Sequence, residues 1–449
     1  MAILAAVACL GAAPWGRADD DALVAAVDAI AADALQPNLA GMSVAVGRGS
    51  AVLMAKGYGF ANVELEAPAR ADTVYHVDSI TKFMTAAAIL KLADEGRLNL
   101  EDDVGRWVPG LSTPTRPIRI RHLLNHTSGL PSYTSLPGFA EKERLDLSHE
   151  DVLAPVRLAP AHFAPGEGWR YCNTGFYLLG MVIEKVTGQS YADYMRTQLF
   201  EPLGMADSSY GDVRPLIKNR ASGYEVEQGR LVNAPLMSWG PPFSGGGVVS
   251  TARDLLKWTD GLAHGRVLTA ASVERMWSPS RLADGSPIDY GLGTRLGTLS
   301  GHRMVGHTGT GGGFRNVLLL FPEDDLTVAV LTNTDAGNTV GVAARIARAV
   351  LRLPAEPRAE RPLPAGAGIP YSGTYDSDEG RVTLFERDGA LRFREKDEDV
   401  TGTPLVYLGD GTFQIPGGPE GRFVMKDGRA RANAVYTDGL FMSAMMRVP

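Results

Sequence analysis

Apolar and polar positions along the chain follow two different periods. Spacings of three and four residues between apolar positions are typical of helices, whereas alternation or short apolar runs are typical of strands. The helical spacing predicts helices over residues 20–33, 79–95, 120–125, 174–186, 190–201 and 340–351. The strand pattern occurs at residues 42–46, 52–55, 290–294, 302–306, 314–321 and 326–332. The last four of these runs are interpreted as antiparallel strands.

The pattern changes after residue 352. Residues 353–369 are rich in Pro, Ala, Arg and Glu, which is typical of a linker. Over residues 370–449, short alternating runs are separated by Asp-Gly and Gly-Gly turns, which predicts a small antiparallel all-β domain, barrel-like in form. Residues 19–352 are therefore predicted to form one main domain, followed by the linker and the β domain.

The first 18 residues are interpreted as a signal peptide. A short apolar run at residues 3–13 precedes Gly16-Arg17-Ala18, whose small residues suit cleavage before Asp19. No positive charge precedes the run, so the start is atypical or truncated. Anchoring as a lipoprotein through Cys9 is a less favoured alternative. A secreted or periplasmic location is expected.

Composition narrows the classes of partner. The chain has 449 residues, a 45% hydrophobic fraction and a net charge of -7. This balance gives no basic surface for nucleic acid and no polybasic segment for a membrane, and no run is long enough to span a bilayer. The two cysteines, Cys9 and Cys172, support neither a disulfide framework nor a Cys-rich metal site.

Candidate chemistry begins at Ser79. It is the only serine with a lysine three residues on, Lys82, and positions three apart share one face of a helix. A serine becomes nucleophilic when a neighbouring base takes its proton. Asp78 is expected to cap this helix, so that N–H groups of the first turn point at the Ser79 oxygen.

Two further short patterns supply possible partners. Tyr171-Cys172-Asn173 is the only Tyr-x-Asn in the chain and follows a Gly-rich loop. His307-Thr308-Gly309-Thr310 opens a Gly-rich strand. Together these residues meet the needs of acyl transfer. Ser79 attacks, Lys82 and Tyr171 share the base role, and Asn173 orients Lys82 and the substrate amide.

Two details of this chemistry follow. The backbone N–H groups of Ser79 and Thr310 are expected to form the oxyanion hole. A lysine at its reference pKa is no base at neutral pH, so burial and nearby cations must lower the pKa of Lys82. The choice between Lys82 and Tyr171 as base stays open, since the two could titrate together.

In combination and order, these three patterns resemble the signatures of the penicillin-recognising serine hydrolases. The resemblance is to the branch that holds class C β-lactamases, D-Ala-D-Ala carboxypeptidases, D-aminopeptidases and related esterases. It covers residues 20–353 and includes supporting stretches at residues 122–130, 200–205 and 246–251. It implies an α+β fold with an antiparallel sheet, flanking helices and a helical subdomain. The C-terminal domain resembles the lipocalin-like domains of some members.

One position departs from the β-lactamase pattern. The third signature there usually opens with Lys, whereas this chain has His307, which is mostly neutral at pH 7. A substrate carboxylate therefore loses a fixed charge, for which Thr308, Thr310 and Arg315 could compensate. This favours esterase or peptidase activity over efficient β-lactam hydrolysis. Cys172 is interpreted as a buried apolar filler rather than a reactive thiol.

Other kinds of site are less well supported. His122 and His126 are four apart, but no Glu lies between them, so we expect them to anchor a buried loop rather than to bind metal. No Gly-x-Ser-x-Gly elbow occurs, which argues against an α/β-hydrolase. No Gly-x-Gly-x-x-Gly follows a strand, so no phosphate cradle is predicted. We therefore expect neither a metal nor a cofactor.

The sequence thus predicts a serine hydrolase that cleaves amides or esters through an acyl-enzyme on Ser79. Its substrates would be D-amino-acid peptides, β-lactams or small esters. A promiscuous carboxylesterase with little β-lactamase activity is the alternative. A catalytically silent binding or scaffold protein is a third hypothesis, and the intact set of signature residues argues against it. The oligomeric state is left open.

Overall fold

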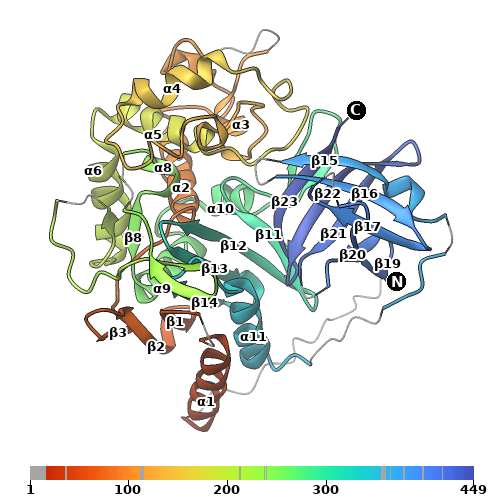
Figure 1. The fold of residues 1–449 in the computed structure, drawn as a ribbon. Coiled ribbons are helices and arrows are strands. Elements are labelled where there is room, and N and C mark those ends of the chain that lie inside the picture. The colour runs from red at the N-terminus through yellow and green to blue at the C-terminus, as the bar shows by residue number, and fades with distance from the viewer. Residues whose placement is uncertain are drawn as a thin grey trace, which may run out of the picture.

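In the computed structural model of the chain, helices cover both faces of an antiparallel sheet, and a second β module lies beside it (Figure 1). The predicted signal peptide, with Cys9, lies outside the described residues except for its last two positions, which begin the first helix. The structure describes residues 17–35, 38–111, 116–211, 214–236, 238, 240–354, 360–364, 366–377, 380–396, 399–416 and 418–448.

The main sheet is built from strands that are apolar on both faces. Along β14 (Leu326–Thr332) every residue is buried, and successive side chains enter two different cores. Val328 packs into one core and Ala329 into the other, as the two-residue period of a strand requires. The antiparallel order is β11 (Arg295–Leu299), β12 (His302–Gly311), β13 (Phe314–Phe321), β14, β1 (Gly41–Arg48), β2 (Ala51–Asn62) and β3 (Ala67–Pro68).

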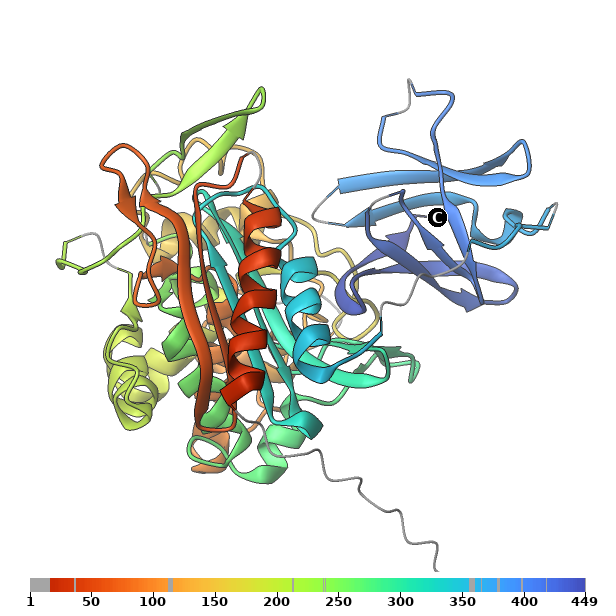
Figure 2. The same cartoon turned by 90° about the horizontal axis from the view of Figure 1, so that it is seen from below.

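Helices cover both faces of this sheet. α1 (Arg17–Ala34) and α11 (Thr339–Leu351) lie side by side on one face, as the view from below shows (Figure 2). α2 (Ile80–Asp94) and α9 (Ala252–Ala263) pack on the other face. α2 is buried over nearly its whole length, so its N-terminal end lies fixed inside the molecule.

A helical subdomain stands at one end of α2 (Figure 1). α5 (Asn173–Thr187) is its central helix, and it ends at Gly188 in the left-handed conformation. Ser190 caps the next helix by accepting from the N–H of Asp193. The other helices here are α3 (Ile120–Leu124), α4 (His149–Leu158) and α6 (Tyr191–Met195).

The C-terminal strands form the second β module. They continue the main sheet, because β23 pairs with β11 through Gly297 and Leu440. The predicted α+β fold with additional C-terminal β strands is therefore confirmed. The strands are β15 (Gly373–Ser377), β16 (Gly380–Arg387), β17 (Ala390–Arg394), β18 (Thr403–Pro404), β19 (Val406–Gly409), β20 (Thr412–Gln414), β21 (Glu420–Lys426), β22 (Arg429–Thr437) and β23 (Leu440–Arg447).

One predicted strand is wrong. Residues 290–294 form a turn in which the N–H of Gly291 donates to the carbonyl of Thr294, at 2.8 Å. Gly293 has a positive φ of 74°, which interrupts the extended backbone. The strand therefore begins only at Arg295.

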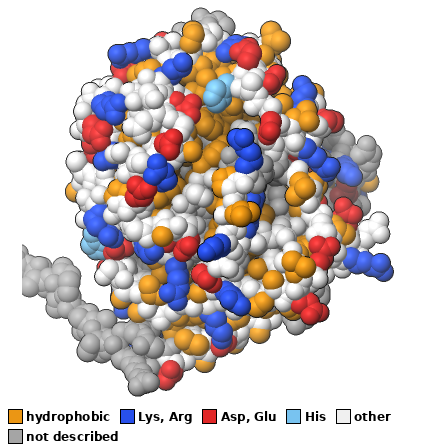
Figure 3. Space-filling view, turned by 90° about the vertical axis from the view of Figure 1, so that its left-hand side faces the viewer, with side chains coloured by type: hydrophobic (Ala, Val, Ile, Leu, Met, Phe, Trp, Pro, Cys, Tyr) orange, Lys and Arg blue, Asp and Glu red, His pale blue; other side chains and the backbone are white. Residues whose placement is uncertain are grey.

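The surface agrees with the mixed charge of the sequence. On the face shown in Figure 3, acidic and basic side chains are interspersed around a hollow with apolar side chains. Within the described part of the chain, no helix is both long enough and apolar enough to cross a membrane.

Candidate active site

Ser79 lies at the N-terminal end of α2. The helix begins at Ile80 with Ser79 as its N-cap, so the expected cap at Asp78 is wrong. Asp78 instead adopts a positive φ of 46° and is buried in the turn before Ser79. Lys82 donates to Ser79 Oγ at 2.9 Å and to the carbonyl of Gly245 at 2.7 Å. The predicted pair is thus within hydrogen-bonding distance.

The surroundings of Lys82 suit a neutral amine. Its side chain is fully buried, and burial together with nearby Arg295 lowers its pKa to about 7. Asp78 acts in the opposite direction and raises this pKa in part. The lowered pKa favours the neutral amine near neutral pH, in which the nitrogen can accept a proton from Ser79.

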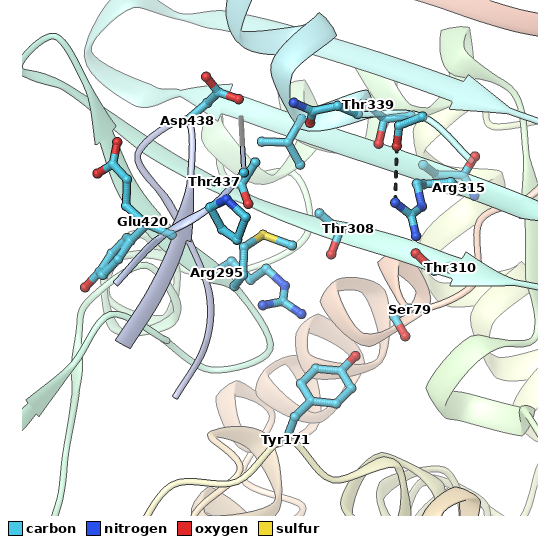
Figure 4. A pocket seen from close by; sticks show the side chains of 18 of the residues that line it. Ser79, Tyr171, Arg295, Thr308, Thr310, Arg315, Thr339, Glu420, Thr437 and Asp438 are labelled. Carbon is cyan, nitrogen blue, oxygen red and sulfur yellow. Dashed lines mark hydrogen bonds between the residues drawn. The ribbon is translucent and has the colours of Figure 1, made fainter. Parts of the chain in front are cut away.

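Tyr171 lies on the loop before α5 and borders the same site. Its hydroxyl points toward Ser79 (Figure 4). Its ring centroid lies 5.0 Å from Lys82 Nζ and 5.3 Å from Arg295 Cζ. The ring of His126 lies behind it, at 4.4 Å between centroids. These contacts place the Tyr171 hydroxyl beside the nucleophile.

Asn173 lines the cavity, but it does not orient Lys82 as expected. Its amide donates to Thr134 Oγ1 at 3.0 Å. Lys82 donates instead to the carbonyl of Gly245, which belongs to the short helix α8 (Phe243–Gly246) before β8 (Val248–Ser250). The amide of Asn173 remains beside the space in which a substrate would lie.

The third signature packs β12 against the turn that carries the nucleophile. A Cβ on Gly309 would lie 2.1 Å from the carbonyl oxygen of Val77, so only glycine allows this approach. On either side of it, Thr308 and Thr310 line the cavity above Ser79 (Figure 4). The strand backbone and the start of α2 therefore face the same space.

The third signature opens with His307 and predicted that this residue would contact the substrate. The structure places its side chain elsewhere. Its imidazole is fully buried and is not among the residues that line the cavity. Burial and the nearby Arg295 and Lys82 hold its pKa well below the usual value. A neutral, buried ring gives a substrate carboxylate no fixed charge.

Hydrogen bonds around Tyr290 fix the protons of two buried histidines. The backbone N–H of Cys172 donates to His126 Nδ1 at 3.1 Å, so the proton of His126 is on Nε2, which faces Tyr290 Oη at 3.1 Å. His307 Nδ1 lies 2.6 Å from the carbonyl of Thr308, which only accepts. Tyr290 therefore accepts from His126 and donates to His307 Nε2, at 3.1 Å.

This His126–Tyr290–His307 chain joins three parts of the site. His126 lies behind Tyr171, His307 belongs to β12, and Tyr290 comes from the turn before β11. Burial lowers the pKa of both histidines and raises the pKa of Tyr290. All three groups are neutral near pH 7, and each bond has one donor and one acceptor.

Arg295 is a site residue that the sequence analysis missed. It is only 4% exposed, yet it lines the cavity beside Tyr171 and Thr308. Its Nη1 donates to the carbonyl of Phe441 at 3.3 Å, while Nε has no hydrogen-bond partner. Within the described part of the chain, no carboxylate pairs with it. Its neighbours Thr294 and Leu296 form no catalytic signature with it, so no local pattern in the sequence marked it.

The cavity has a volume of about 890 Å³ and lies between three parts of the chain (Figure 4). One wall comes from the helical subdomain and one from the main sheet and the start of α11. The third comes from the C-terminal β module, whose role the sequence left open. Its contributions include Gln414, Glu420, Thr437, Asp438 and Met442.

The remaining candidates are structural in this fold. His122 Nδ1 accepts from the N–H of Arg119, and the His126 ring lies among aromatic side chains. Within the described ranges, no group of three or more His, Cys, Asp or Glu is arranged to hold a metal. The thiol of Cys172 is buried and donates to the carbonyl of Leu130 at 3.3 Å, as expected of a filler residue.

Comparison with known proteins gives consistent matches. The family model described as Beta-lactamase matches residues 21–352. Penicillin-binding protein 4* of Bacillus subtilis (strain 168) is 32% identical over an alignment of 310 residues, and the match covers 65% of this chain and 68% of that protein.

Two solved structures extend the comparison. The octameric penicillin-binding protein homologue from Pyrococcus abyssi matches with a TM-score of 0.66 and 26% identity, over 95% of this chain and 99% of that one. A D-stereospecific amidohydrolase from Streptomyces sp. matches with a TM-score of 0.62 and 27% identity, over 72% of this chain and 97% of that one. The first match extends into the C-terminal β module.

Proposed function

The chain belongs to the beta-lactamase family of serine hydrolases, and from this premise we propose that it cleaves amides or esters through an acyl-enzyme on Ser79. One observation carries the proposal. Lys82 Nζ lies 2.9 Å from Ser79 Oγ, and its pKa of about 7 makes it a base at neutral pH. Catalytic bases work best when their pKa lies near the working pH.

The reaction proceeds in two steps. Ser79 Oγ attacks the substrate carbonyl carbon while its proton passes to Lys82. The new C–O bond creates an oxyanion, which the N–H groups of Ser79 and Thr310 stabilise. The tetrahedral intermediate collapses, the bond to the leaving amine or alcohol breaks, and that group takes the proton. Water then attacks the acyl-enzyme in the same way and releases the acid.

Lys82 is the base that the geometry favours. It contacts Ser79 directly, while Tyr171 lies alongside with its hydroxyl pointing toward the nucleophile. We infer that Tyr171 carries the proton onward to the leaving group. The two groups share one cluster of charges, so their titrations are coupled.

Substrate preference follows from the charges in the cavity. His307 is neutral and buried, whereas Arg295 keeps a guanidinium beside Thr308 and Thr310. We propose that a substrate carboxylate binds there and that Asn173 orients the scissile amide. D-amino-acid peptides with a free carboxylate and β-lactams both carry such a group. The match to a D-stereospecific amidohydrolase supports a D-configured amide as the substrate.

A promiscuous carboxylesterase is the second candidate. The neutral His307 favours it, because a small uncharged ester needs no cation in the third signature. The silent-scaffold hypothesis is less well supported, since the contact between Lys82 and Ser79 and the lowered pKa of Lys82 are those of a working site.

Intact mass spectrometry tests the proposal. The purified protein is mixed with a penicillin and, in parallel, with an activated small ester, with Ser79→Ala as control. A persistent Ser79-dependent penicillin adduct would indicate a peptidase, and an adduct that clears would indicate a β-lactamase. Rapid ester turnover without a penicillin adduct would indicate the esterase. The absence of any adduct or turnover would contradict the proposal.

Two further expectations belong to this proposal. We propose secretion or a periplasmic location on the basis of residues 1–18, and N-terminal sequencing of the mature protein tests the cleavage before Asp19. We also propose domain boundaries at residues 19–352 and 370–449, with residues 353–369 as a linker. Limited proteolysis tests them, since cleavage is expected first between residues 353 and 369.

A further inference from the structure

The tip of the hairpin formed by β22 and β23, residues 436–442 with the turn at Asp438 and Gly439, reaches from the C-terminal module into the cavity. This β22–β23 hairpin contributes Tyr436, Thr437, Asp438 and Met442 to the cavity wall (Figure 4). Its tip also reaches α11, because a Cβ on Gly341 would lie 3.1 Å from a carboxylate oxygen of Asp438. The hairpin therefore spans one side of the site.

Two glycines hold the hairpin against the main sheet. A Cβ on Gly297 of β11 would lie 2.1 Å from the carbonyl oxygen of Gly439. A Cβ on Gly439 would lie 2.0 Å from the carbonyl oxygen of Thr298. Both backbones thus approach as closely as glycine permits, which no other residue allows without displacement. β11 and the hairpin thus each contribute one glycine to this close backbone contact.

Phe441 connects this junction to the site. Its carbonyl accepts from Arg295 Nη1 at 3.3 Å. Its ring packs against Trp169 at 5.1 Å, and Trp169 in turn packs against Tyr290 and His126, each at 5.8 Å. The hairpin therefore contacts Arg295 directly. It is linked to His126 and Tyr290 through one intervening side chain, that of Trp169.

The placement of Arg295 depends on this contact. The carbonyl of Phe441 accepts a hydrogen bond from the guanidinium of Arg295, and the ring of Tyr171 packs against the same guanidinium. Nε has no partner although the side chain is more than nine-tenths buried. A buried guanidinium without a carboxylate partner is costly, and Arg295 also lines the cavity, where a bound anion would pair with it.

We propose that the β22–β23 hairpin is a specificity element of the active site, which positions Arg295 to bind the carboxylate of the substrate. The inference rests on the proposed function for its substrate class. The C-terminal module then selects anionic substrates, although it supplies no catalytic residue. Phe441 is a positioning residue that acts through Arg295.

Binding to the full-length Ser79→Ala protein tests this inference without requiring turnover. The probes are N-acetyl-D-alanine and its uncharged amide, titrated by calorimetry or NMR. Gly439→Ala pushes the hairpin away from β11. Gly428→Ala is the matched control, because Gly428 also has a positive φ, 76° against 82°, in the same module, but has open space around its Cβ position.

The expected result is a preference for the carboxylate that falls at least about tenfold in Gly439→Ala and stays unchanged in Gly428→Ala. Binding of the amide should change little. If Gly439→Ala does not fold, Phe441→Leu carries the test, with a smaller loss of the same preference. An unchanged preference in a folded variant, or none in the parent protein, would overturn the inference. Carboxylate binding without any Ser79-dependent turnover in the wild type would instead uphold it while refuting the proposed function.

Discussion

Lys82 and Arg295 lie against the same aromatic ring, that of Tyr171, with their charged groups 5.0 and 5.3 Å from its centroid. Two buried cations this close disfavour each other's charge. The guanidinium does not lose its proton in proteins, so the effect falls on the lysine. Arg295 therefore has two consequences, a lowered pKa for Lys82 and a site for an anion.

The first prediction concerns the pH dependence of catalysis. Because Lys82 must be deprotonated to act as base, kcat/KM should rise with pH and reach half its maximum near the Lys82 pKa of about 7. The measurement is ester or amide hydrolysis across the neutral range, with Lys82→Ala expected to slow acylation by orders of magnitude. A profile without this rise would exclude Lys82 as the base.

Replacing Arg295 with Gln should move this profile. The arginine lowers the pKa of Lys82, so its removal raises that pKa and shifts the rising limb of activity to higher pH. The variant should also lose its preference for substrates with a carboxylate. Arg315→Gln serves as control, because Arg315 lines the cavity but donates to the carbonyl of Gly337. An equal shift in both variants would contradict the specific role of Arg295.

Gly309→Ala should damage the site through the backbone. The new Cβ would lie 2.1 Å from the carbonyl oxygen of Val77, so β12 must move away from the turn that carries Ser79. We expect a loss of about 1–3 kcal/mol in the free energy of unfolding and of about 10²-fold in kcat. Gly105→Ala is the control, since the nearest neighbour of its Cβ would be the end of the exposed Asp103 side chain, at 3.3 Å, and not a backbone atom. Normal activity in Gly309→Ala would refute this account of the strand.

Tyr290→Phe should lower the free energy of unfolding more than the removal of another buried tyrosine hydroxyl does. It leaves His126 Nε2 and His307 Nε2 buried without their shared partner, at a cost of about 1–3 kcal/mol for each unsatisfied group. Tyr375→Phe is the matched control, because that buried hydroxyl donates to one backbone carbonyl only. Chemical denaturation compares the two, and equal losses would argue against the chain.

Local patterns predicted the elements that carry the nucleophile. The spacing of Ser79 and Lys82 was sufficient because both lie within one helical turn, where geometry is fixed by the sequence separation. The bounds of β13 and β14 were predicted without error, since most residues of both strands are apolar and buried. The confirmed features therefore depend on neighbours in the sequence.

The missed features depend on residues far apart in the chain. His307 lies in β12. The packing of this strand against α2 determines which face of the strand borders the cavity. Arg295 acquires its place from Tyr171 and Phe441, which lie 124 residues before it and 146 residues after it. Residues 290–294 have the apolar pattern of a strand, but Gly293 turns the backbone.

The pairing of β23 with β11 also has a consequence for solubility. β23 pairs with β11 around Gly297 and Leu440, and without the C-terminal module this part of the β11 edge would lose its neighbour; open strand edges recruit strands from other molecules. A chain that ends near Leu353 would also expose the apolar surface that Phe441 and Tyr436 now cover. Aggregation is therefore the expected fate of that fragment, and the module serves the protein as a protective cover for its own sheet.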